Sequence, residues 1–262
     1  MSKLKKQKKY LIKKKAYNPF FSIITVVKNA ENDILKTIKS IKNQSFKKYE
    51  YIIIDGNSQD NTIKNIYKNK KNINILISEK DRGIYFAMNK GLKFVNGEVI
   101  LFVNAGDILV KDALIKIYKK FQNKPDIDFV FGTVRRHYVD STILKYGFNT
   151  SRLKYNFDFA TAHSTGFFIR RKSMKKLGKY KTIFKHSADY DLYYRALIKN
   201  KFKGDHTAKK DLIGIFSSGG YSSKVSFFDH LIEETKIRFY NGQNLLFIFL
   251  IFINAIFKKL FK

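Results

Sequence analysis

The first half of the chain alternates short apolar runs with stretches in which apolar residues recur at helical spacing. The apolar runs, rich in isoleucine, valine and phenylalanine, predict buried strands at residues 20–27, 51–54, 73–77, 99–103 and 127–131. The stretches between them predict amphipathic helices at residues 31–44, 61–69, 84–92 and 114–121. Strands that alternate with single helices are typical of βαβ units. We therefore predict an α/β fold with a Rossmann-like, mostly parallel sheet and helices on both faces.

Beyond the fifth predicted strand the pattern becomes less regular. A hairpin is predicted over residues 135–146, and an aromatic, loop-like segment over residues 147–164. A strand at residues 165–169 is followed by a helix that begins at Lys172, and a further helix opens at Ser187. The second half is therefore expected to add elements of mixed type to the sheet.

The two ends of the chain differ from its middle. Residues 1–18 form a basic N-terminal arm that lacks an apolar core long enough for a signal peptide. Residues 19–224 form the predicted α/β domain, and residues 225–262 form a C-terminal segment in which apolar residues recur at helical spacing. We therefore expect one large domain between a basic arm and a helical tail.

The tail contains an unusually apolar stretch. Residues 245–257 are apolar except for Asn254, and Lys258 and Lys259 follow. A spanning helix needs about 20 apolar residues, so this stretch is too short to cross a bilayer comfortably. Two interpretations stay open, a helix buried in the core and an interfacial helix beside an anionic membrane surface. The second predicts a cytoplasmic protein that lies peripherally on the inner face of a bacterial membrane.

Composition narrows the classes of function. The chain of 262 residues carries a formal net charge of +31 and has no cysteine, which excludes disulfides and thiolate metal sites. The charge favours an anionic partner such as nucleic acid, an acidic membrane or a phosphorylated substrate. Lysine greatly outnumbers arginine, the residue preferred for base and phosphate recognition, so we expect no nucleic-acid partner. The sequence also lacks the glycine-rich fingerprints of dinucleotide-binding folds and phosphate-loop nucleotidases.

Three aspartates follow predicted strands. Asp55, Asp81 and Asp107 each come shortly after an apolar run and have glycine nearby. Because the carboxyl ends of parallel strands meet at one edge of a sheet, we expect these carboxylates along that edge, where ligands bind. A carboxylate at Asp107 suits a hard divalent cation shared with a substrate phosphate. One such aspartate is more often a turn residue, so it is the grouping of three that favours a ligand site.

Several segments together resemble the family-2 glycosyltransferases. They read SIITVVKNAENDILKTIKSIKNQSF, YIIIDGNSQDNT, SEKDRGIYFAMNKGLKFVNGEVILFVNAGD and SADYDLYYRA, in this order within residues 20–220. The resemblance implies a GT-A fold and an inverting enzyme that uses a nucleotide-sugar donor, with a UDP-sugar expected. It also implies Mn²⁺ or Mg²⁺ as cofactor. The implied acceptor is a hydroxyl of a saccharide or lipid-linked saccharide in cell-surface glycan synthesis.

The resemblance also implies roles for single residues. Asp107 matches the metal ligand, and Asp189 matches the catalytic base. The other matched residues are expected to contact substrate, and they are Thr25, Val26, Asn29, Asp55, Asp81, Asn89, Lys90, Asn104, His163 and Asp191. Judged without the resemblance, His163 is an ordinary polar residue, and Asp189 is an acid stabilised by a helix dipole.

Two positions depart from the family pattern. Relatives usually carry aspartate where this chain has Phe86, so a group that helps to place the donor is missing. Asn104 and Gly106 stand where many relatives have acids. Asp107 is then left as the strong anionic ligand, which predicts weaker metal binding.

The chemistry implied by the resemblance needs few groups. An acceptor hydroxyl attacks a sugar carbon bonded to a diphosphate, and a cation stabilises the charge on the leaving group. A carboxylate on the opposite side takes the hydroxyl proton, and in-line attack inverts the configuration. Two alternatives stay open. One is a basic protein that binds nucleic acid or another anionic polymer without catalysis. The other is a sugar-phosphate nucleotidyltransferase, which needs a glycine-rich loop, whereas residues 20–30 contain no glycine.

Overall fold

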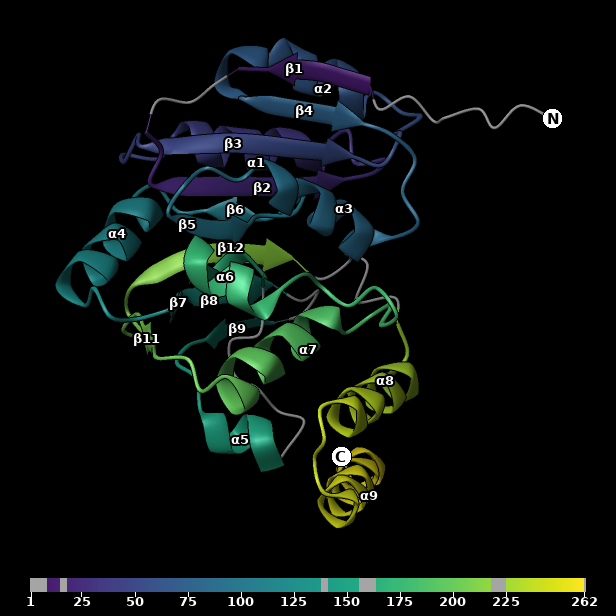
Figure 1. The fold of residues 1–262 in the computed structure, drawn as a ribbon. Helices are drawn as coiled ribbons and strands as arrows, with labels where there is room; N and C mark the ends of the chain where they lie inside the picture. The colour runs from purple at the N-terminus through teal and green to yellow at the C-terminus, as the bar shows by residue number, and fades with distance from the viewer. Residues whose placement is uncertain (1–8, 15–17, 138–140, 156–163, 218–224, 262) are drawn as a thin grey trace.

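The computed structural model describes residues 9–14, 18–137, 141–155, 164–217 and 225–261. Within this part of the chain, a central sheet of eight strands runs in the order β1-β4-β3-β2-β5-β10-β7-β11 (Figure 1). Its strands, in that order, are Lys9–Lys13, Ile75–Ser78, Tyr49–Asp55, Phe21–Val27, Val99–Phe102, Phe167–Arg170, Phe129–Phe131 and Gly204–His206. All five strands predicted in the first half of the chain belong to this sheet.

The centre of the sheet is parallel. Strand β2 pairs in parallel with β3 and β5, and β3 pairs in parallel with β4. Strand β10 runs antiparallel between β5 and β7, and β1 runs antiparallel to β4 at the edge. The predicted α/β fold with a mostly parallel sheet is therefore confirmed.

A second, smaller sheet has the strand order β6-β12-β8-β9. Its strands are Ile108–Leu109, Leu212–Ser217, Thr133–His137 and Thr142–Lys145, in the same order. Strands β8 and β9 pair antiparallel, which confirms the predicted hairpin. Strands β6 and β12, which join segments about a hundred residues apart, have no counterpart in the sequence prediction.

Helices cover both faces of the central sheet, because alternate side chains of its strands point to opposite sides. One face packs against α1 (Asp33–Lys42), α2 (Thr62–Lys68) and α4 (Ala113–Asn123). The other packs against α3, α5, α6 and α7, which are Ile84–Gly91, Thr150–Tyr155, Arg171–Leu177 and Ala188–Tyr194. Helix α7 continues into a π-helical turn at Arg195–Lys199. Short 3-10 turns lie at Lys70–Asn72, Leu92–Phe94 and Ser164–Gly166.

The structure changes two expectations about irregular segments. Part of the basic arm forms strand β1, whose residues Lys9–Lys13 pair with β4 because that edge of the sheet offers unpaired backbone groups. The predicted aromatic loop at residues 147–164 contains helix α5, whose Leu153 is fully buried. One buried leucine per helix is too little periodicity to recognise in a sequence.

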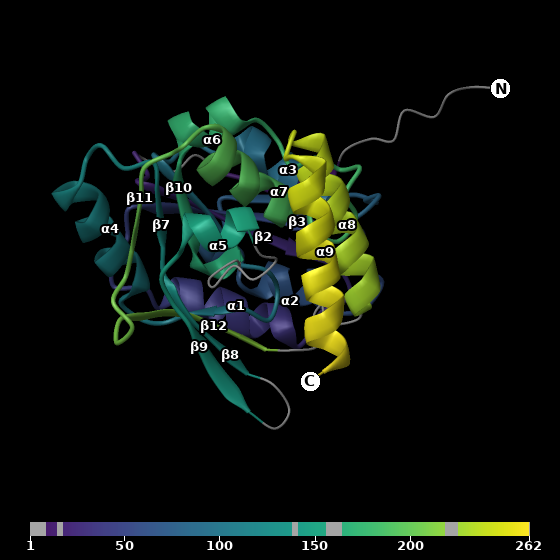
Figure 2. The ribbon, with the colours of Figure 1, turned by 90° about the horizontal axis from the view of Figure 1, so that it is seen from below.

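The predicted helical tail consists of α8 (Phe227–Tyr240) and α9 (Leu245–Leu260), which lie side by side (Figure 2). Helix α8 buries Leu231, Ile237 and Arg238, whereas α9 buries only Ile248 and Ile251. The exposed apolar side chains of α9 are Leu245, Leu246, Phe247, Phe249, Leu250, Phe257 and Leu260. The interpretation of this stretch as a buried core helix is therefore wrong. No helix in the described part of the chain has the length and hydropathy needed to cross a bilayer.

Candidate functional site

The turns that follow β3 and β5 meet at the end of β2. Gly56 and Ala105 both donate backbone hydrogen bonds to carbonyls at that end, over 2.9 and 3.4 Å. Asp55 and Asp107 belong to these two turns, so they lie at the same edge of the sheet, as the strand pattern predicts. We call this edge, with Asp55, Asp81, Asn104 and Asp107, the strand-end site.

Asp55 lies at the end of β3 with its side chain fully buried. Its carboxylate accepts hydrogen bonds from the hydroxyls of Ser58 at 2.5 Å and Ser78 at 2.6 Å. The Ser58 hydroxyl in turn accepts from the backbone N–H of Asn29, and the Asn29 side chain accepts from the N–H of Gln59. Asp55 and Asn29 therefore hold together the turns after β2 and β3.

Asp81 follows β4 and forms an ion pair with Lys90 of α3. The Lys90 ammonium also lies 2.8 Å from the carboxylate of Glu79. Burial raises the pKa of Asp81, Lys90 lowers it, and the negative charges of Glu79 and Asp55 raise it further. Asp55 and Asp81 are thus close enough for their negative charges to repel each other. The Lys90 ammonium is shared between the carboxylates of Asp81 and Glu79.

The turn after β5 provides a candidate metal site. Asp107 is 8% exposed and accepts a hydrogen bond of 2.5 Å from the Thr165 hydroxyl. Burial raises the pKa of Asp107 to about 7, although that hydrogen bond lowers it. The Asn104 amide donates to Ser164, and its Oδ1 atom is buried without a hydrogen-bond partner in the described structure. An unpaired amide oxygen and a buried carboxylate in one turn fit a hard divalent cation, which prefers oxygen ligands.

The described residues contain no cluster of three or more His, Cys, Asp or Glu side chains that could hold a metal by themselves. The fit of a cation at this turn therefore rests on two side chains, Asp107 and Asn104. The role of Asp107 as the strong anionic ligand stays a prediction.

Asp189 lies in the first turn of α7 and is partly buried. One carboxylate oxygen lies 3.0 Å from the hydroxyl of Tyr85 and accepts the backbone N–H of Tyr190 at 2.9 Å. The Tyr85 hydroxyl also lies 2.9 Å from the carbonyl of His186. Burial raises the pKa of Asp189, and the hydrogen bond from Tyr85 lowers it. We call residues 185–191 the Asp189 segment.

Three of the predicted substrate-contacting residues have side chains engaged elsewhere. Thr25 is fully buried and donates to the Val103 carbonyl at 2.6 Å, and Val26 is 6% exposed within the core. The Asn89 amide donates to the carbonyl of Tyr180 at 2.8 Å and accepts its N–H at 2.9 Å. The side chains of Thr25 and Val26 are thus covered by protein, whereas that of Asn89 is half-buried, and their contact with substrate stays a prediction.

Asp191, another predicted contact, is fully buried within a network of its own. Its carboxylate accepts from Arg195 at 2.7 Å and from the Asn241 amide at 2.9 Å, and Lys181 lies 3.4 Å away. This arrangement indicates a structural role, because both carboxylate oxygens accept hydrogen bonds from protein donors. His163 lies outside the described residues.

The residue that departs from the family pattern has a local partner. The Phe86 ring lies under the guanidinium of Arg82, 4.5 Å from the ring centroid. At the position in α3 where the resemblance implies a carboxylate, this chain therefore has a cation–π contact with Arg82 of the preceding loop.

Sequence reasoning missed several side chains that organise the site. Tyr85 contacts Asp189, Thr165 contacts Asp107, and Glu233 of α8 accepts three backbone hydrogen bonds from the Asp189 segment. Each bonds to a partner 46 or more residues away in the chain, so no local pattern in the sequence predicts the contact. For Tyr85, the one signal in the sequence is its place in the Gly-Ile-Tyr segment that resembles the family.

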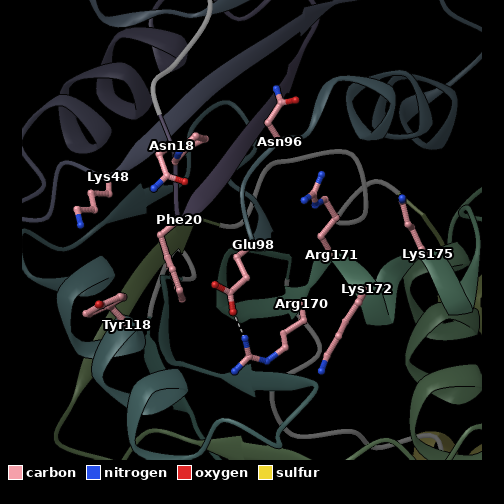
Figure 3. Close-up of a pocket in the computed structure, with 11 residues that line it drawn as sticks. Asn18, Phe20, Lys48, Asn96, Glu98, Tyr118, Arg170, Arg171, Lys172 and Lys175 are labelled. Atoms are coloured by element: carbon pink, nitrogen blue, oxygen red, sulfur yellow. Dashed lines mark hydrogen bonds and ion pairs between the residues drawn. The ribbon is translucent and has the colours of Figure 1, made fainter.

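A pocket of about 540 Å³ lies at the other edge of the sheet, where β2 and β5 begin (Figure 3). Glu98 and Arg170 form an ion pair within it, and the side chains of Arg171, Lys172 and Lys175 line one side. Parallel sheets bind ligands at the carboxyl ends of their strands. This pocket lies at the opposite ends of β2 and β5, away from the strand-end site.

Comparison with known proteins agrees with the geometry. The family model described as Glycosyl transferase family 2 matches residues 22–178. An uncharacterized glycosyltransferase of Methanocaldococcus jannaschii is 30% identical over 200 residues, covering 71% of this chain and 67% of that protein. A UDP-Glc:alpha-D-GlcNAc-diphosphoundecaprenol beta-1,3-glucosyltransferase of Escherichia coli is 31% identical over 112 residues, covering 42% of this chain and 44% of that protein.

Solved structures share the fold at low sequence identity. Residues 1–349 of TarS from S. aureus, in complex with UDP, superpose with a TM-score of 0.63 at 19% identity, over 84% of this chain and 64% of that chain. The mannosyltransferase PcManGT from Pyrobaculum calidifontis, in complex with GDP-Man and Mn²⁺, gives 0.65 at 15% identity, over 95% and 72%. These structures confirm the predicted GT-A architecture, and the family match identifies the chain as a glycosyltransferase that belongs to family 2.

Proposed function

We propose that this protein is an inverting glycosyltransferase that moves a sugar from a UDP-sugar to a hydroxyl of a saccharide or lipid-linked saccharide. The observation that carries the proposal is the pair of carboxylates, Asp107 at the strand-end site and Asp189 at the start of α7. They come from separate segments of the chain. The reaction needs two such groups, because negative charge develops on the leaving diphosphate on one side of the sugar carbon and the acceptor hydroxyl loses its proton on the other.

The strand-end site is proposed to hold the donor. Asp55 and Asp81 are placed to contact the nucleoside, and Asp107 and Asn104 would hold Mn²⁺ or Mg²⁺. A bound cation would supply charge stabilisation for the leaving diphosphate. PcManGT, which shares the fold, was solved with Mn²⁺, and this supports the choice of cofactor. Because Asp107 and Asn104 are two oxygen ligands within the described residues, the diphosphate would add further oxygen ligands, and metal affinity should depend on nucleotide.

Asp189 is proposed as the general base. Its pKa lies above the usual aspartate range because the group is buried, which makes the carboxylate a stronger proton acceptor. Tyr85 can serve both protonation states of this group. It donates to the Asp189 carboxylate before the reaction, and afterwards it can accept a hydrogen bond from the protonated Asp189 carboxyl while donating to the His186 carbonyl, 2.9 Å away.

The acceptor is proposed to be presented at a membrane. One relative, the glucosyltransferase of Escherichia coli, is named for a diphosphoundecaprenol acceptor. The exposed apolar side chains of α9, followed by Lys258 and Lys259, have the character of an interfacial helix beside anionic lipid. Such a helix would place the protein peripherally on the inner face of a bacterial membrane, near a lipid-linked substrate for cell-surface glycan synthesis.

The proposal is tested by incubating the protein with a panel of UDP-, GDP- and dTDP-sugars and Mn²⁺, and by following nucleotide release and the anomeric configuration of the product. We expect turnover of a UDP-sugar with inversion. Retention of configuration contradicts the proposed mechanism. Tight binding of DNA without any binding of UDP and Mn²⁺ points instead to a basic anion-binding protein.

A further inference from the structure

The segment that carries Asp189 is held by a helix beyond the family match. The match ends at residue 178, and α8 begins at Phe227. We propose that Glu233 of α8 is a positioning residue that holds the Asp189 segment in its reactive place. This inference rests on the proposed role of Asp189 as general base.

The Glu233 carboxylate gathers three consecutive backbone N–H groups. One of its oxygens accepts from Lys185 at 2.6 Å, and the other accepts from His186 at 2.7 Å and from Ser187 at 2.6 Å. Hydrogen bonds to an ionised acceptor are about twice as strong as neutral ones. A single side chain therefore fixes the three residues that lead into α7.

Helix α7 depends on this carboxylate for its first turn. Ser187 stands at the N-cap of α7, and its side chain forms no capping hydrogen bond to the helix; its hydroxyl instead contacts His230 of α8 at 3.1 Å. A negative charge near a helix N-terminus is stabilising. Glu233 supplies that charge from a different helix, and its bond to Ser187 lies two residues before Asp189.

The contact reaches Asp189 through one peptide group. The N–H of Ser187 donates to Glu233, and the carbonyl of the same peptide group, that of His186, lies 2.9 Å from the Tyr85 hydroxyl. That same hydroxyl lies 3.0 Å from the Asp189 carboxylate. The loss of Glu233 would free the N–H side of the peptide group between His186 and Ser187, and the Tyr85 hydroxyl that contacts both this carbonyl and Asp189 would be held less firmly.

Helix α8 is itself firmly anchored, so Glu233 is a fixed acceptor. Arg238, fully buried one and a half turns further on, donates to the carbonyls of Leu153 and Lys154 at 2.8 Å each and to the Tyr190 hydroxyl at 2.6 Å. Asn241, at the end of α8, donates to Asp191. The residues before α7 and the first turn of α7 are thus both bonded to α8, with Asp189 between these attachments.

The experiment compares Glu233→Gln, Glu233→Asp and the control Asp229→Asn in the full chain. Asp229→Asn makes the same carboxylate-to-amide change on an exposed turn of α8, where the side chain contacts Ser226 of its own helix. Glu233→Gln turns one acceptor into a donor that faces backbone N–H groups. Because misplacing a catalytic group by about 1 Å can cost ~10²-fold, we expect kcat to fall ~10- to 100-fold.

The donor half of the reaction should be untouched by these changes. We expect KM for the UDP-sugar and Kd for UDP to stay within ~2-fold in Glu233→Gln, because the strand-end site does not contact Glu233; a general loss of fold would change both. Glu233→Asp, which keeps the charge, should recover part of kcat, and Asp229→Asn should match the wild type.

Asp189→Asn is measured in the same series to separate the two proposals. If Asp189→Asn is inactive while Glu233→Gln keeps kcat within ~2-fold, the positioning role is overturned and the proposed base stands. If Asp189→Asn is as active as the wild type, the proposed base and the positioning role both fail. Should Glu233→Gln not fold, Glu233→Asp decides the matter: full wild-type kcat in this shortened side chain contradicts positioning.

Discussion

Asp55 of the strand-end site and the Asp189 segment are held in place over very different distances along the chain. Asp55 is bound by Ser58, three residues away, and by Ser78 on the neighbouring strand. Asp189 is bound by Tyr85, 104 residues away, and its segment is bound by Glu233, 46 to 48 residues away. The first is built by strands and their turns, whereas the second exists only after α3, α7 and α8 have packed together.

This difference has consequences for what each region can tolerate. The strand-end site sits on the rigid parallel centre of the sheet, so a substitution there should remove a ligand contact and leave the fold intact. The Asp189 segment is assembled from several helices, so substitutions there should combine losses of rate with losses of stability. The predictions below test that distinction.

The largest effect is expected for Asp107→Ala. Removing a metal ligand that acts on the leaving diphosphate should lower kcat/KM by ~10³-fold or more, with the melting temperature little changed. Steady-state kinetics at increasing Mn²⁺ checks this, with Asp112→Ala, an exposed aspartate five residues away, as the control. Activity within a few fold of the wild type would rule out Asp107 as the ligand.

Asp191→Asn should act chiefly on stability. The substitution leaves the buried Arg195 without its charged partner, which typically costs ~3 kcal/mol or more. Thermal unfolding of the variant should show a clear drop in melting temperature, and the folded fraction should keep kcat within a few fold. A variant as stable as the wild type but without activity would show that Asp191 acts in substrate binding or catalysis and not in holding the fold.

Tyr85→Phe should shift the pH dependence of kcat. A general base works only when deprotonated, so activity rises with pH as Asp189 loses its proton, and burial places that rise above the usual aspartate range. The Tyr85 hydrogen bond lowers the pKa of Asp189, so its removal should move the rise to still higher pH. A pH profile of kcat that is unchanged in Tyr85→Phe contradicts the contact or the role of Asp189.

The smallest effect on chemistry is expected from the exposed face of α9. Leu246→Glu together with Phe249→Glu places charge on two side chains that are 64% and 60% exposed. Since burying each apolar group is worth ~2 kcal/mol, binding to anionic vesicles should weaken more than 10-fold while UDP binding is unchanged. Ile143→Glu, on β9, is the control for an exposed apolar residue elsewhere. Equal vesicle binding by all three proteins argues against membrane docking through α9.

The same contrast explains what the sequence could predict. The strands, their helices and the aspartates after them follow from local patterns, and each was predicted close to its observed place. Thr165, Tyr85 and Glu233 depend on which segments pack together, and no periodicity records that. Asn89 and Asp191 were assigned to substrate by the family motif, yet their side chains are engaged with Tyr180 and Arg195. A motif locates a segment, but the direction of each side chain is decided by tertiary packing.

Edge strands were also beyond local prediction. β1 lies in a lysine-rich arm, and β6 has two residues, so neither has the alternation that marks a strand. They form because β4 and β12 offer unpaired backbone groups, which is a property of the assembled sheet.

The central claim is that Asp189, at the start of α7, removes the acceptor proton. The most direct measurement is kcat of Asp189→Asn with a UDP-sugar at saturation, together with Kd for UDP and Mn²⁺. The substitution keeps the shape of the side chain but removes its ability to accept a proton. We expect kcat to fall by ~10²–10⁴ with Kd unchanged within ~2-fold. A variant that keeps kcat within a few fold of the wild type contradicts the account.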